Sequence, residues 1–267
     1  MGQDSTKGRK VTIFDFVVKM PIHKFDLINL DQNPNLKSQI EELSKLSWPE
    51  FLLHGDVRHW SSLFNIFSGY QIAFVAEQYK VIAVGHTVPF IWDGSTDDLP
   101  ENLDILMNRA VQDCNTIKKP NCLSALAVVI HPDYRKENLS ARMIEAMIDL
   151  GKEHGIENLL APLRPTLKSK YPEMPFDEYI NMQTRNGELF DPWIRVHLRM
   201  GAEVLKIMRE SIKVIGTVSE WEEWTGMKFP DSGQYLIEGG MQPLIIDKEK
   251  NHGVYTEPNL WVRHTIA

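Results

Sequence analysis

The chain has 267 residues, of which 43% are hydrophobic and 24% are charged, a composition typical of a globular protein with an ample core. Acidic residues outnumber basic ones, 36 to 29, which argues against a general nucleic-acid partner. No apolar run reaches the length of a membrane span, and Cys114 and Cys122 have neither metal-site nor redox spacing. We therefore expect a cytoplasmic protein with no membrane partner, disulfide or bound metal.

The first half of the chain alternates between strand and helix patterns. Residues 1–10 are polar and predict a disordered N-terminus, and the remainder, 11–267, is expected to form a single domain. Apolar runs predict a strand at 11–20 and an antiparallel hairpin made of 70–77 and 80–88. Apolar residues at helical spacing predict three helices, at 36–46, 60–67 and 103–117.

The middle of the chain predicts a strand, a turn, a helix and a second strand within residues 123–164. Residues 123–130 are apolar and rich in β-branched side chains, as in a strand buried on both faces. Pro132 and Asp133 then break the strand. The helix that follows has apolar residues at i, i+4 spacing and ends before a glycine: Leu139, Met143, Met147 and Gly155. Residues 156–163 predict the second strand.

The last third is less regular. Four prolines predict a loop with a short helical piece over 163–178, and a short helix is expected at 193–200. Two separate strands are expected at 202–208 and 211–218, followed by three short apolar segments at 235–237, 244–246 and 260–266. Together these patterns predict an α/β fold, a mixed, twisted, mostly antiparallel sheet flanked by helices around the central βαβ unit.

A turn that leads from a buried strand into a helix exposes unpaired backbone N–H groups, here those of residues 136–141, and such groups favour an anion. The segment resembles motif A of the GNAT acyltransferase superfamily, in which V-x-P-x-x-R/Q-x-x-G-x-G/A holds the pyrophosphate of acyl-CoA. Both glycine positions are substituted here, which would weaken close approach of a phosphate. An ordinary βαβ unit without a ligand is the alternative interpretation. The residues that the resemblance assigns to the cofactor are Val128, Val129, Arg135, Lys136, Asn138, Leu139 and Ser140.

Several motifs in the second half occur in a distinctive order: LRPT at 163–166, FDPWIRVH at 190–197, GTVSEWEEWTG at 216–226 and EPNLW at 257–261. This series resembles the GNAT-like domains in loading modules of polyketide synthases, of the curacin type. The resemblance implies a GNAT fold that decarboxylates a malonyl-type acyl thioester on an acyl carrier protein or on CoA, with S-acyl transfer as a further activity.

The resemblance also implies roles for individual residues. Thr166 and His197 take the catalytic positions, Trp60 falls in the substrate pocket, and Arg209 falls near a further pocket arginine. A hydroxyl and an imidazole suit this chemistry because both can donate to the thioester oxygen as an enolate forms. No tightly bound cofactor is needed. The phosphopantetheine arm of a carrier protein engaged in trans, or acyl-CoA, is the expected substrate.

Two other functions stay open from the sequence. One is an acetyl-CoA-dependent N-acetyltransferase that acts on a small amine, and the other is a non-catalytic module that binds acyl-CoA or an acyl carrier. Each candidate residue also has a structural explanation: Thr166 in a loop can bond its own backbone, while His197 and Trp60 lie in apolar surroundings typical of a core.

Overall fold

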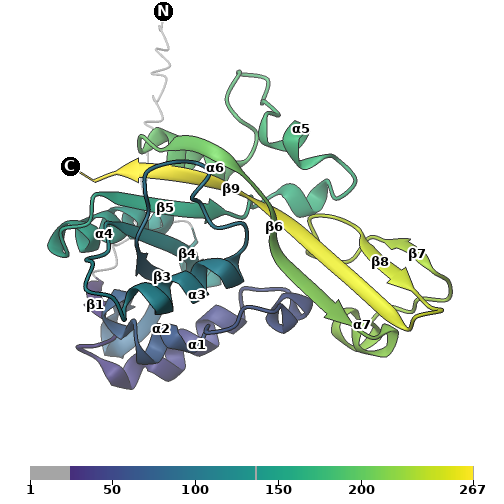
Figure 1. The fold of residues 1–267 in the computed structure, drawn as a ribbon, viewed down its shortest axis with the longest axis horizontal. Coiled ribbons are helices and arrows are strands. Elements are labelled where there is room, and N and C mark those ends of the chain that lie inside the picture. The colour runs from purple at the N-terminus through teal and green to yellow at the C-terminus, as the bar shows by residue number, and fades with distance from the viewer. Residues whose placement is uncertain (1–24, 136, 267) are drawn as a thin grey trace, which may run out of the picture.

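The computed structural model describes residues 25–135 and 137–266, which form a nine-stranded sheet with helices on both faces (Figure 1). The strand order is β1-β2-β3-β4-β5-β9-β8-β7, and β6 also pairs with β9. Only β4 and β5 run parallel among the described strands. The strands are β1 (Asp26–Asn29), β2 (Gln71–Ala76), β3 (Lys80–Phe90), β4 (Cys122–Ile130), β5 (Asn158–Leu163), β6 (Glu203–Gly216), β7 (Gly233–Tyr235), β8 (Leu244–Asp247) and β9 (His252–Thr265). The predicted fold class is confirmed, whereas the predicted disordered segment 1–10 and strand 11–20 lie outside the described residues.

Helices cover the two faces of this sheet. The side chains of β2 alternate between them, since Ile72 and Phe74 pack in one core cluster with α4, and Ala73 and Val75 pack in another with α1. Figure 1 shows α1 and α2 below the sheet, and α6 packs in the same core cluster as α4. The α-helices are α1 (Lys37–Lys45), α2 (Ser62–Asn65), α3 (Leu103–Asp113), α4 (Leu139–Glu153), α5 (Phe176–Ile180), α6 (Pro192–Arg199) and α7 (Val218–Thr225). Short 3₁₀ turns lie at Pro34–Leu36, Glu50–His54, Ser68–Tyr70, Glu77–Tyr79, Pro132–Tyr134 and Lys168–Lys170. None of the described helices is long and apolar enough to cross a membrane.

The central strand β4 carries a β-bulge. Thr87 of β3 lies opposite Ala125, but the preceding residue His86 lies opposite Ala127, so Leu126 is an extra residue on β4. An extra residue reverses the alternation of side chains along a strand. Accordingly Ala125 packs in the cluster that contains α4, whereas Ala127 packs in the cluster that contains α1. Because of the bulge, Ala125 and Ala127 of β4 pack on opposite faces of the sheet, although they are two residues apart.

Helix α4 packs closely against the sheet and confirms the predicted βαβ unit. A Cβ atom on Gly85 of β3 would lie 2.7 Å from Met143 Sδ and 2.7 Å from Met147 Cε, so glycine permits this close approach. At its end, Gly155 has a φ of 69°, the left-handed conformation that closes a helix. These contacts fix α4 directly beside β4, which positions its N-terminus at the carboxyl end of that strand.

The strands β6 and β9 extend beyond the rest of the sheet as an arm that carries α7, β7 and β8 (Figure 1). This arm has its own core, in which the buried rings of Trp221 and Tyr255 contact Phe51. Thr217 and Glu220 form a capping box at the start of α7. The arm is therefore held by packing and does not depend on strand pairing alone.

The structure corrects several predicted boundaries. The two strands predicted at 202–208 and 211–218 are one strand, β6, because Arg209 and Glu210 lie at an irregularity of pairing with β9 and point outward. Strand β9 begins at His252, eight residues before the predicted start, because its first half alternates buried and half-buried residues and contains no apolar run. Helices α2 and α3 are shorter than predicted, and the predicted hairpin and the helices at 36–46 and 193–200 are confirmed within one or two residues.

Candidate active site

A cavity of about 920 Å³ opens where β4 and β5 separate. The two strands pair only through Cys122–Ser124 and Asn158–Leu160, although β4 continues to Ile130 and β5 to Leu163. Past these pairs, the edges of the two strands that face the gap make no backbone hydrogen bonds to each other in the described structure. Such unpaired edges can bond an extended ligand that carries amide groups, as an additional strand does.

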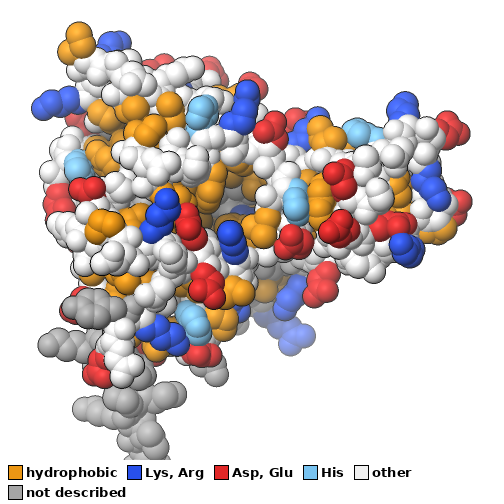
Figure 2. Space-filling view, turned by 90° about the horizontal axis from the view of Figure 1, so that it is seen from below, with side chains coloured by type: hydrophobic (Ala, Val, Ile, Leu, Met, Phe, Trp, Pro, Cys, Tyr) orange, Lys and Arg blue, Asp and Glu red, His pale blue; other side chains and the backbone are white. Residues whose placement is uncertain are grey.

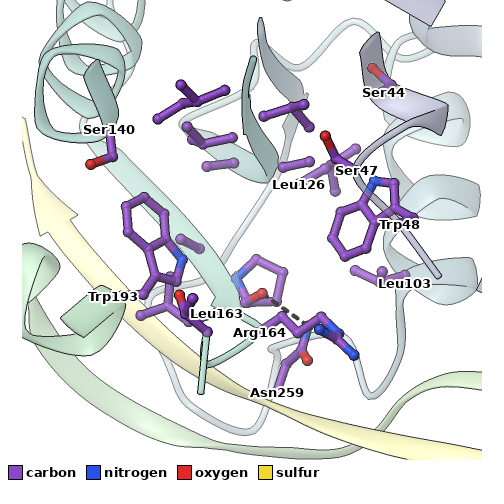
Figure 3. A pocket seen from close by; sticks show the side chains of 18 of the residues that line it. Ser44, Ser47, Trp48, Leu103, Leu126, Ser140, Leu163, Arg164, Trp193 and Asn259 are labelled. Atoms are coloured by element: carbon purple, nitrogen blue, oxygen red, sulfur yellow. Dashed lines mark hydrogen bonds between the residues drawn. The ribbon is translucent and has the colours of Figure 1, made fainter. Parts of the chain in front are cut away.

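The cavity passes through the sheet from one face to the other. One end is lined by Ser140 of α4 and Trp193 of α6, and the other by Ser44 and Trp48 on the α1 side (Figure 3). In Figure 2, which views the molecule from below, the surface is hollowed near the centre, with hydrophobic side chains in and around the hollow. Residues at both ends are accessible to solvent, among them Arg135 beside α4 and Lys45 on α1. The cavity is thus a channel through the sheet that has solvent-accessible lining residues at both ends.

The residue before α4 has a backbone conformation that glycine commonly adopts. Asn138 has a φ of 55°, a left-handed conformation that asparagine tolerates better than most residues. Its side chain does not cap the helix, so the N–H groups of the first turn stay available. The substitution that argued against an anion site in the sequence is therefore compatible with one in the structure.

The other residues assigned to the cofactor separate into two groups. Val128, Val129, Arg135 and Ser140 line the cavity, and Ser140 lies in the first turn of α4 (Figure 3). Leu139 is 1% exposed and packs in the core beneath the turn. Lys136 lies outside the described residues. A ligand phosphate at this turn would therefore meet backbone N–H groups and Arg135.

The structure brings Thr166, His197 and Trp60 to the same cavity. Thr166 is exposed and lies in the loop that follows β5. His197 lies on α6 and is 1% exposed, with Trp193 packed edge-on at 4.4 Å between ring centroids. Its Nε2 is buried and has no hydrogen-bond partner. The hydroxyl and the imidazole therefore line one cavity.

His197 is paired with a second histidine that sequence reasoning missed. Its Nδ1 lies 2.9 Å from Nε2 of His264 on β9. Burial, with a smaller contribution from the neighbouring His264, lowers the pKa of His197 to about 3. Burial also lowers the pKa of His264. Both rings are therefore neutral at pH 7, and a single proton lies between the two facing nitrogens.

The position of that shared proton determines what His197 can do. If His197 Nδ1 carries it, Nε2 is a lone-pair acceptor and can take a proton from a substrate. If His264 Nε2 carries it, His197 Nε2 bears the hydrogen and can donate to a substrate oxygen. The pair therefore supports either general-base chemistry or stabilisation of an oxyanion.

Arg209 is not part of this cavity. Its guanidinium pairs with the Asp177 carboxylate at 3.2 Å, and both side chains are more than half exposed. A different arginine occupies the cavity: Arg164 donates from Nε to Glu257 Oε1 at 2.7 Å and from Nη2 to Glu257 Oε2 at 3.1 Å and to the Gly239 carbonyl at 2.8 Å. The LRPT motif contains Arg164, but only the structure shows that Arg164 lines the cavity.

Arg164 and Asn259 offer a donor and an acceptor beside each other in the cavity (Figure 3). Nη1 of Arg164 makes no hydrogen bond in the described structure. Asn259 donates to the Pro162 carbonyl at 3.0 Å, and its Oδ1 is buried without a partner. A buried polar atom without a partner is rare in proteins, so Asn259 Oδ1 marks a place where a polar ligand could bond.

A scan against protein-family models finds no match. Among curated proteins, the chain is 28% identical over 249 residues to the arginine N-acetyltransferase avaD of Aspergillus versicolor, covering 82% of this chain and 85% of that relative. Among solved structures, it resembles the loading GNATL domain of CurA from Lyngbya majuscula, with a TM-score of 0.59, 18% identity, and coverage of 91% and 98%. It also resembles the GphF GNAT-like decarboxylase in complex with isobutyryl-CoA, with a TM-score of 0.55, 12% identity, and coverage of 92% and 100%.

The structural matches show that the chain has the GNAT fold. This fold, and the name of the curated relative, agree with the resemblance to GNAT acyltransferases seen in the sequence.

Proposed function

We propose that the protein is an acyl-CoA-dependent N-acyltransferase that acts on a small amine. The observation that carries this proposal is the channel through the sheet, which is accessible from both faces. A transfer reaction needs access for two substrates, whereas a decarboxylation needs access for one. In support, the curated relative is named an arginine N-acetyltransferase, and Asn138 adopts the left-handed backbone that a glycine at this position would also allow.

Acyl-CoA would enter from the side of α4. Its phosphates would meet the N–H groups at the start of that helix and Arg135, and its pantetheine arm would bond the unpaired edge of β4. The thioester would then lie near the bulge at Leu126. The amine would approach from the side of α1, past Trp60.

The chemistry assigned to this site uses His197 and Thr166. The amine nitrogen attacks the thioester carbonyl, and His197 Nε2 accepts the proton that the nitrogen loses. Thr166 donates its hydroxyl to the oxyanion, a kind of contact that lowers a barrier by about 3–4 kcal/mol. His264 holds the ring of His197 in place through their shared proton.

Arg164 and Asn259 suggest which amines fit. A carboxylate on the substrate would take the free Nη1 of Arg164, and an ammonium or amide N–H would take Asn259 Oδ1. The combination favours an amine that also carries a carboxylate, as an amino acid does.

A second candidate is decarboxylation of a malonyl-type thioester on CoA or on an acyl carrier protein in trans. Thr166, His197 and Trp60 lie in one cavity, which is the arrangement that the loading-module resemblance implies. With the proton on His264, His197 Nε2–H would donate to the enolate oxygen as a neutral imidazole.

One experiment separates these functions. The protein is incubated with acetyl-CoA and a panel of amines that includes arginine and agmatine, and in parallel with malonyl-CoA and a malonyl-loaded carrier protein, and all products are weighed by mass spectrometry. Acetylated amine supports N-acyl transfer. Loss of carbon dioxide from the malonyl thioester without acetylation of any amine would contradict N-acyl transfer and support decarboxylation. If the protein binds CoA but forms neither product, it is a non-catalytic binding module.

A further inference from the structure

The two side chains assigned to catalysis are carried by different elements. Thr166 lies in the loop after β5, and His197 lies in the second turn of α6. The chain between them leaves the sheet, forms α5 and returns to begin α6 (Figure 1). N-acyl transfer needs the hydroxyl and the imidazole at fixed positions around one carbonyl carbon. The loop and the helix must therefore be held relative to each other.

Asp191 joins the loop to the helix. It is 2% exposed, and each of its two carboxylate oxygens accepts two hydrogen bonds. Oδ1 accepts the backbone N–H groups of Trp193 at 2.9 Å and of Ile194 at 3.3 Å, which caps the N-terminus of α6. Oδ2 accepts the backbone N–H of Leu167 at 2.9 Å and the hydroxyl of Tyr179 at 2.8 Å. One buried carboxylate thus bonds both elements that carry the catalytic side chains.

The bond to Leu167 lies one residue from Thr166. The backbone of residues 164–166 makes no hydrogen bond to other backbone groups in the described structure. The Leu167 N–H is therefore the first backbone donor after β5 that has a partner, and this partner is Asp191. Because Thr166 directly precedes this anchored group, the position of its hydroxyl depends on the bond between Leu167 and Asp191.

A helix cap alone does not require this arrangement. Serine and asparagine cap helices about as well as aspartate does, and a cap uses one side-chain oxygen. The second oxygen of Asp191 instead bonds two groups that lie 24 and 12 residues away along the chain. One of them is the phenol of Tyr179, whose pKa is raised by burial and by its hydrogen bond to Asp191, so it keeps its hydrogen and donates it.

We propose that Asp191 is a positioning residue for N-acyl transfer, which ties the Thr166 loop to the start of α6 and so sets the Thr166 hydroxyl relative to the His197 imidazole. This inference rests on the proposed function. Asp191 does not line the cavity, so it acts through Leu167 and through the helix and not on a substrate. A displacement of about 1 Å in such a site can lower a rate about 100-fold. Loss of the link should therefore lower kcat, whereas CoA binding at α4 is unaffected.

Two variants change the two bonds of the same oxygen separately. Asp191→Ser keeps one oxygen to cap α6 but has no second oxygen for Leu167. Tyr179→Phe is the matched control, because it removes the other donor to Oδ2 and leaves the bond to Leu167 in place. Neither residue lines the cavity. We expect Asp191→Ser to lower kcat for acetyl transfer about 100-fold, with the Kd for CoA within about twofold, while Tyr179→Phe keeps kcat within about threefold.

A double variant shows whether the effect passes through Thr166. Thr166→Ala removes the hydroxyl and should itself lower kcat about 100- to 1,000-fold. In that background Asp191→Ser has no hydroxyl to displace, so it should lower kcat by less than about threefold more. A further loss of about 100-fold in the double variant, or a wild-type kcat in Asp191→Ser alone, would overturn the inference.

Hydrogen exchange followed by mass spectrometry measures the link without any activity. The Leu167 amide should exchange slowly in the wild type and in Tyr179→Phe and rapidly in Asp191→Ser, while the amides of α6 stay protected in all three. Rapid exchange of Leu167 in the wild type would overturn the inference. If the wild type acylates no amine, the proposed transfer is wrong, and the exchange of Leu167 still decides whether Asp191 holds the loop.

Discussion

The ion pair between Arg164 and Glu257 makes several hydrogen bonds at the cavity. Removing either partner should lower the free energy of unfolding. Glu257 is completely buried, and its two carboxylate oxygens accept two hydrogen bonds from Arg164 and one from Tyr255. Burial alone would lower the pKa of Arg164, but the Glu257 carboxylate raises it above its usual value, so the pair stays charged. Glu257→Gln leaves a buried guanidinium without its countercharge.

The expected loss in the free energy of unfolding is about 3–5 kcal/mol for Glu257→Gln or for Arg164→Met, because each leaves one buried charge unpaired. In a chain of this size that corresponds to a fall of about 2–4 °C in Tm per kcal/mol. The double variant Arg164→Met/Glu257→Gln buries no charge, and it should lose less than the sum of the two single losses by about 2–3 kcal/mol.

Urea unfolding of the wild type, both single variants and the double variant measures these four free energies. Ser47→Ala serves as a control at the same cavity that breaks no ion pair. Strictly additive losses, or a loss below about 1 kcal/mol for Glu257→Gln, would refute the reasoning that the pair is buried and mutually dependent.

Three further predictions follow from the same structure. Asn138→Gly should keep or raise stability, whereas Asn138→Val should lose about 1–2 kcal/mol and CoA affinity, because only the first accepts a φ of 55° without strain; thermal unfolding and calorimetric titration with CoA check both. In the double variant of Arg164 and Glu257, KM should rise for arginine but not for agmatine, which lacks the carboxylate. Equal changes of KM for both amines would show that Arg164 does not bind the substrate carboxylate. His86 and His197 have pKa values lowered to about 4 and about 3, so below about pH 6.5 they bind protons in the unfolded chain but not in the folded one. Stability is therefore full above pH 6.5 and should fall as the pH drops toward 5, with a slope that approaches about 1.4 kcal/mol per pH unit for each histidine, and a flat urea-unfolding profile between pH 7 and 5 would contradict this.

The sequence predicts the centre of the fold because its signals there are local. The apolar strand before Pro132, the helical spacing of Leu139, Met143 and Met147, and the glycine at 155 each act within a few residues, and the structure confirms all of them. The sequence predicts two strands in place of β6 and a late start for β9. Both differ from the structure because the pairing of these long strands tolerates charged and polar residues at irregularities.

The channel could not be predicted in the same way. It depends on the point at which β4 and β5 stop pairing and on one extra residue in β4, and both are set by tertiary packing. The partner His264 was missed because it lies 67 residues from His197 in the chain. The left-handed conformation of Asn138 could not be predicted because the sequence shows only that asparagine replaces the motif's glycine.

The most direct test of the central claim, that an acyl-CoA lies between β4 and β5 with its phosphates at the start of α4, is a calorimetric titration of CoA into the wild type and into Ser140→Asp. An aspartate in the first turn of a helix favours the helix, so the variant should be as stable as the wild type or more stable. The same negative charge would repel the phosphates, and CoA affinity should fall at least about tenfold, or 1.4 kcal/mol, while Ser140→Ala binds nearly normally. Equal CoA affinity in the wild type and Ser140→Asp, or no binding to the wild type at all, would contradict the account.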